Sequence, residues 1–61
     1  MILIIDDDSA VRSSLSFMLK RAGYEVQTVP GPREAMEVVR SVAPDLILMD
    51  MNFTLSTTGE I

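Results

Sequence analysis

Ile2-Leu3-Ile4-Ile5-Asp6-Asp7-Asp8 stands at the start of the chain, and Leu46-Ile47-Leu48-Met49-Asp50 repeats its pattern: an unbroken aliphatic run that ends at a carboxylate. Such a run is typical of a parallel strand buried on both faces. Parallel strands deliver their carboxyl ends to one edge of a sheet, where ligands bind. Carboxylates gathered there repel one another unless a cation lies among them. The two stretches therefore predict a site for Mg²⁺ and a phosphoryl group.

The residues after the first stretch predict an amphipathic helix. Asp8 can cap a helix that begins at Ser9, and Gly23 suits its C-terminal stop. Residues 12–14 are expected on an exposed face of this helix. The apolar residues recur at helical spacing and form one stripe, which consists of Val11, Leu15, Met18, Leu19 and Ala22.

A second helix and two further strands are predicted downstream. Residues 24–29 alternate as a strand does, and Pro30-Gly31-Pro32 breaks the pattern. A helix is expected from about Arg33 to Val42, followed by a third strand at residues 46–49. The order strand, helix, strand, helix, strand predicts an α/β fold with a parallel sheet, because right-handed crossovers place the helices on the faces of such a sheet. The apolar positions of the second helix are Ala35, Val38, Val39 and Val42.

Composition narrows the class of protein. A chain of 61 residues forms at most one small domain, here residues 1–61, and a domain of that size has marginal stability. Without cysteine or histidine, carboxylate oxygens are the plausible cation ligands. A net charge of −4 with five basic residues argues against a nucleic-acid-binding surface. No apolar run approaches the roughly 20 residues of a membrane span, and no targeting signal is seen, so we expect a cytoplasmic protein.

The two carboxylate stretches carry a resemblance to a known family. Ile2-Leu3-Ile4-Ile5-Asp6-Asp7-Asp8 and Pro44-Asp45-Leu46-Ile47-Leu48-Met49-Asp50-Met51-Asn52, with an amphipathic helix between strands, resemble the receiver domain of two-component response regulators. The resemblance covers the whole chain. It implies the N-terminal half of a flavodoxin-like fold: two helices and three parallel strands in the order 2-1-3 of the complete order 2-1-3-4-5. The tail resembles receivers attached to AAA+ enhancer-binding activators in two stretches, Met51-Asn52-Phe53-Thr54 and Thr57-Thr58-Gly59-Glu60.

The resemblance also implies roles for individual residues. Asp50 is the expected phosphoacceptor, which takes a phosphoryl group from a sensor histidine kinase. Asp6 and Asp7 match the acidic pair that holds Mg²⁺, together with Asp50 and the backbone carbonyl of Asn52. The hydroxyl residue and the lysine that hold the phosphoryl oxygens in the family belong to the later strands and are assigned to no residue here. Asp8 is expected to serve as a helix cap. In the family the first helix often contacts the kinase, so residues 12–17 are either partner surface or a solvated face.

Three functions remain open at this point. The leading one is a signalling module, a truncated receiver that is a switch and not an enzyme. The second is an assembly fragment without phosphotransfer, which pairs through its exposed third strand with a second copy and so forms a homo-oligomer. The third is a Mg²⁺-dependent phosphohydrolase of the aspartyl-phosphate type. That class usually has a second Asp two residues after the nucleophile, where this chain has Asn52. The acidic triplet alone could also be a solvated turn.

Overall fold

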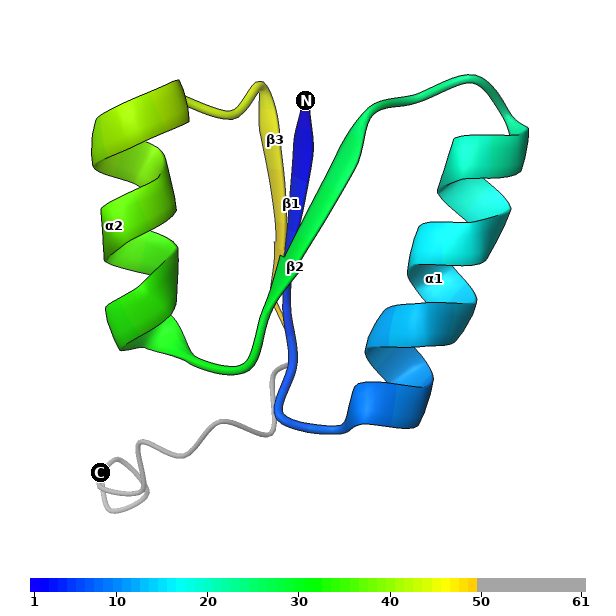
Figure 1. The fold of residues 1–61 in the computed structure, drawn as a ribbon, viewed down its shortest axis with the longest axis horizontal. Helices are drawn as coiled ribbons and strands as arrows, with labels where there is room; N and C mark the ends of the chain where they lie inside the picture. The colour runs from blue at the N-terminus through cyan, green and yellow to red at the C-terminus, as the bar shows by residue number, and fades with distance from the viewer. Residues whose placement is uncertain (50–61) are drawn as a thin grey trace, which may run out of the picture.

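The computed structural model describes residues 1–49 of the chain. Its elements are β1 (Ile2–Ile5), α1 (Ser9–Arg21), β2 (Val26–Val29), α2 (Pro32–Val42) and β3 (Leu46–Met49). The strands form one three-stranded sheet in the order β2-β1-β3, and both pairings are parallel. The helices cover opposite faces of the sheet (Figure 1). The predicted α/β class, the strand order and the two helices are confirmed.

The core is built around β1, the central strand. All four of its residues are buried, and Leu3 and Ile4 are the largest side chains that are fully enclosed. Leu3 and Ile5 pack with Val29 and Ala35 on the side of the sheet that α2 covers. Because side chains alternate along a strand, Ile2 and Ile4 lie on the α1 side. The unbroken aliphatic run is therefore explained by apolar contacts on both faces of β1.

Helix α1 is capped at both ends, by a side chain at its N-terminus and by backbone hydrogen bonds at its C-terminus. Asp8 is the N-cap, and its carboxylate accepts from the N–H groups of Ala10 and Val11 at 2.9 and 3.4 Å. At the other end, Gly23 donates to the carbonyl of Lys20 and Tyr24 donates to that of Leu19, which closes a Schellman motif. Gly23 has φ +99°, a conformation that L side chains rarely adopt. Both predicted ends of this helix are confirmed.

The second strand starts later than predicted. Its expected range began at Tyr24, but β2 begins at Val26. The N–H of Tyr24 is already bonded to the end of α1, so this residue belongs to the turn. The first bond to β1 comes from the N–H of Ile2 to the carbonyl of Glu25, at 2.8 Å.

Helix α2 starts one residue earlier than predicted. Gly31 is its N-cap and Pro32 its first residue, a position where proline's fixed φ and missing N–H are tolerated. Of its apolar positions, Ala35 is buried, while Val39 and Val42 remain 36% and 49% exposed. The last residue of the helix is Val42, and its C-cap, Ala43, has a left-handed conformation with φ 54°.

The third strand is covered least. Within residues 1–49, β3 pairs only with β1 and forms one edge of the sheet. Leu46, Ile47 and Met49 are 50%, 45% and 50% exposed. At its start the amino group of Met1 donates to Asp45 at 2.6 Å, and this hydrogen bond and positive charge lower the pKa of the Asp45 carboxyl. The described part of the chain contains no helix long and apolar enough to cross a membrane.

Ala43→Gly is expected to stabilise the chain by roughly 0.5 to 1 kcal/mol, because glycine adopts the left-handed conformation without the steric cost that a Cβ brings. Thermal or urea unfolding followed by circular dichroism measures the change.

The matched control is Ala22→Gly. Ala22 caps α1 in the right-handed region, at φ −81°. Glycine relieves no strain there and costs up to about 1 kcal/mol of backbone entropy. Equal effects of the two substitutions would show that the backbone conformation of Ala43 stores no strain.

Candidate functional site

Asp6 is the one buried charged residue in the described part of the chain, with 6% of its surface exposed. It follows β1, and its N–H donates to the carbonyl of Val29 at 3.2 Å, which continues the pairing with β2. One carboxylate oxygen, Oδ1, accepts the N–H of Asp8 at 2.9 Å. No buried side-chain oxygen or nitrogen in residues 1–49 lacks a hydrogen-bond partner, so the second oxygen of Asp6 still reaches solvent.

Asp7 and Asp8 differ in what their carboxylates do. Asp8 is exposed but is committed to the first turn of α1, as predicted. Asp7 is exposed, and its carboxylate makes no hydrogen bond to another described residue. The triplet therefore offers the free oxygen of Asp6 and the whole carboxylate of Asp7 at the carboxyl end of β1.

These two carboxylates alone do not form a metal site. Within residues 1–49 no three acidic side chains converge on a point that could hold a metal ion. The other two predicted ligands, Asp50 and Asn52, lie outside the described residues, as does the tail with its resemblance to AAA+ activators. The donor chemistry of Asp6 and Asp7 fits Mg²⁺, which prefers hard oxygen ligands and retains several waters.

Arg12 is the residue at this edge that sequence reasoning missed. It was expected on an exposed face of α1, but it is half-buried, and its Nη1 donates to the backbone carbonyl of Asp6 at 2.7 Å. The prediction of an exposed Arg12 was wrong because the side chain turns back past the N-terminus of the helix to the end of β1. A signal was available: a basic residue one turn into a helix that follows a strand can reach the last residues of that strand.

Comparisons with known proteins point to one family. The sequence matches the model of the response regulator receiver domain over residues 2–57. Protein-glutamate methylesterase/protein-glutamine glutaminase 1 of Anaeromyxobacter dehalogenans is 46% identical over 50 residues, which cover 82% of this chain and 14% of that protein. Response regulator MprA of Mycolicibacterium vanbaalenii is 42% identical, with coverage of 82% and 22%.

A third relative is the alkaline phosphatase synthesis transcriptional regulatory protein PhoP of Bacillus subtilis, which is 36% identical, with 82% of this chain and 21% of that protein covered. The matched segment thus spans less than a quarter of each of these relatives. No solved structure matches the chain. The match to the family model covers nearly the whole sequence, and the parallel sheet in the order β2-β1-β3 has the predicted receiver topology. The chain belongs to the response regulator receiver domain family of two-component signalling systems.

Proposed function

We propose that the chain supplies the acceptor half of a receiver, with Asp50 as the residue that takes up a phosphoryl group. The observation that supports this is the register of the sheet. β1 and β3 are parallel neighbours whose last paired residues are Ile5 and Met49. The next residues in sequence are Asp6 and Asp50. Carboxylates that directly follow two adjacent parallel strands in the sequence suit a phosphoryl-transfer site.

Mg²⁺ is the cofactor that we propose for this site. Asp6 and Asp7 would hold it together with Asp50 and the backbone carbonyl of Asn52. When bound, the ion supplies positive charge that offsets the charge of the transferring phosphoryl oxygens. The protein's own part is to hold the nucleophile. One carboxylate oxygen of Asp50 forms a bond to phosphorus, while the bond from phosphorus to the donor breaks and the leaving group departs with that electron pair. The first test is intact mass after incubation of the chain with Mg²⁺ and acetyl phosphate.

Asp7→Asn is expected to weaken Mg²⁺ binding about tenfold or more, because it removes a charged ligand with no other described partner. Isothermal titration calorimetry with MgCl₂ measures the affinity.

Asp8→Asn serves as the matched control. Asparagine caps a helix as well as aspartate does, so α1 keeps its N-cap while one acidic charge is lost from the same turn. Mg²⁺ affinity should then stay within about twofold of the unsubstituted chain, apart from weak screening by salt. A loss as large as that of Asp7→Asn would mean that Mg²⁺ responds to the overall charge and not to a ligand.

Receiver domains of response regulators typically interact with histidine kinases, and we propose a histidine kinase as the phosphoryl donor for this chain. The acceptor is modified once and is not a turnover catalyst. A phosphohydrolase needs a second acid or base near the nucleophile, and Asn52 stands where that class usually has aspartate. Sustained release of phosphate from a phosphoester would contradict the proposal.

We also propose that two copies of the chain pair through β3. The outer edge of β3 has no neighbouring strand within residues 1–49, and both of its faces carry half-exposed apolar side chains. Exposed edges of this kind pair readily with other strands. Two-fold symmetry would set the two β3 strands antiparallel and join the two sheets into one.

Ile47→Lys is expected to shift the chain from dimer to monomer, because it places a charge on the apolar face of that edge. Light scattering coupled to size-exclusion chromatography measures the mass. Met36→Lys is the matched control, since Met36 is exposed to a similar extent, 52%, but lies on α2. A well-folded monomer of the unsubstituted chain would refute the pairing.

A further inference from the structure

A pocket lies between α1 and β2, and its Arg12 end lies beside the acidic edge, where Arg12 donates to the carbonyl of Asp6. Its volume is about 410 Å³, within the range of small-molecule sites. It is lined by Ser9, Arg12, Ser13, Ser16, Phe17, Lys20 and Thr28. The pocket borders β2, on the opposite side of β1 from the exposed strand β3. A second copy paired along β3 therefore leaves it open.

The charged residues of the pocket are both cations. In a chain with a net charge of −4, Arg12 and Lys20 are two of only five basic residues, and no acidic side chain lines the pocket with them. Neither forms an ion pair with a described carboxylate; the one such ion pair is between Met1 and Asp45. An anion is thus the ligand that the electrostatics favour.

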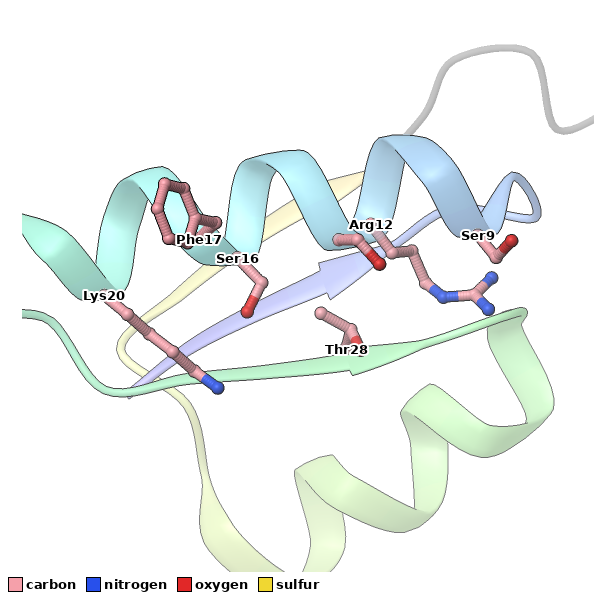
Figure 2. A pocket seen from close by; sticks show the side chains of 7 residues that line it. Ser9, Arg12, Ser16, Phe17, Lys20 and Thr28 are labelled. Atoms are coloured by element: carbon pink, nitrogen blue, oxygen red, sulfur yellow. The ribbon is translucent and has the colours of Figure 1, made fainter.

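Arg12 is held in place for such a role. Its Nη1 is fixed by the carbonyl of Asp6 at 2.7 Å, and the side chain is half-buried. A guanidinium has five N–H donors, so the remaining ones stay available in a fixed fork that suits phosphate oxygens. Figure 2 shows its guanidinium near Ser9, at one end of the space between α1 and β2. Because this cation is immobilised by the protein, a ligand loses little free energy in ordering it.

Neutral donors lie between the two cations. Ser16 and Thr28 extend into the space between α1 and β2 (Figure 2). The hydroxyls of the pocket make no hydrogen bond to a described residue, whereas that of Ser41 donates to the carbonyl of Glu37. Lys20 follows Arg12 by eight residues, roughly 12 Å along a helix. The distance between the cations indicates an extended ligand.

Phe17 adds an apolar side chain to the lining of the pocket, and in Figure 2 its ring lies against α1, on the side away from β2. It is 62% exposed, and the guanidinium of Arg21 lies 5.7 Å from its centroid. Exposed aromatic rings provide flat surfaces on which a planar group can pack.

We propose that this pocket binds a small phosphate monoester that carries a flat ring, of the nucleoside monophosphate class. The phosphate lies against Arg12 and accepts from the nearby hydroxyls, and the ring extends along the pocket toward Phe17. This binding is separate from phosphoryl transfer to Asp50, because it needs no Mg²⁺ and none of the pocket residues is a proposed Mg²⁺ ligand.

Calorimetric titration of the full chain with adenosine monophosphate in EDTA tests the proposal. EDTA removes divalent ions, so a failure of the acidic site cannot affect the result. Saturable binding is expected, with inorganic phosphate weaker and uncharged adenosine much weaker. Arg12→Gln should reduce affinity about tenfold or more, the usual effect of losing a charge-assisted hydrogen bond, and Lys20→Gln at least about threefold.

Arg40→Gln is the control, because it removes the same charge from the last turn of α2, outside the pocket. It should leave the affinity unchanged. If Arg12→Gln does not fold, as judged by circular dichroism, Lys20→Gln and Ser16→Ala carry the test, since both side chains lie at the surface of α1. No saturable binding, affinity unchanged by the pocket variants, or an equal loss with Arg40→Gln would overturn the proposal.

Discussion

Asp50→Asn is expected to abolish the phosphoryl adduct that acetyl phosphate and Mg²⁺ form on the chain. An amide is a far weaker nucleophile than a carboxylate and does not form an acyl phosphate, so the loss should be complete. Intact mass spectrometry distinguishes the two species directly. The unsubstituted chain should gain the mass of one phosphoryl group and no more.

Two controls make that result specific. Asp45→Asn removes a carboxylate from the opposite end of β3, where it pairs with the amino group of Met1, and the adduct should persist. Omission of Mg²⁺ should suppress the adduct on every variant. An adduct that survives Asp50→Asn would place the acceptor elsewhere. An unmodified mass on a chain that circular dichroism shows to be folded would refute acceptor chemistry within these 61 residues.

Leu3→Ala is expected to unfold the chain. Leu3 is completely buried in the central strand, and truncation of such a side chain costs about 2 to 5 kcal/mol through lost burial and the cavity left behind. A domain of this length has a total stability of only about 3 to 9 kcal/mol. The loss is therefore comparable with the whole free energy of unfolding. Circular dichroism during urea titration should show little or no folded baseline.

Met36→Ala is the matched comparison, since Met36 is also a long apolar side chain but is 52% exposed on α2. Because little of it is buried and alanine favours helices, its loss should cost less than about 1 kcal/mol. If both substitutions cost the same, the core does not lie where β1 is buried between α1 and α2.

The helices and strands were predicted most accurately where the local sequence favoured a single structure. The run Ile2–Ile5 allowed no reading other than a buried strand, and Asp8 before Ser9 marked the start of α1. The start of β2 was predicted wrongly, because a strand and a helix-ending turn could both use the same backbone N–H group. Tyr24 has a strand-forming side chain, but the Schellman motif of α1 uses its N–H.

Longer-range effects were harder to predict. Met18 was placed on the apolar stripe of α1, yet it is 61% exposed, and no residue of α1 is buried within residues 1–49. Arg12 was expected on an exposed face, either solvated or in contact with a partner, because helical periodicity gives no information on a side chain that turns back to the preceding strand. The acidic pair was recognised from its position after a strand, but its arrangement with Asp50 depends on residues beyond the described range.

The position of β1 at the centre of the sheet also bears on how the chain folds. The strand that needs partners on both edges is made first, and its partners Val26 and Leu46 follow about two dozen and more than forty residues later. Each pairing must close a long loop before it contributes any stability, and contacts of this kind slow folding. During synthesis, Leu3 and Ile4 therefore stay without their full set of neighbours until β3 has left the ribosome. β1, whose four residues are all buried in the folded chain, is therefore the strand that stays incompletely buried for longest.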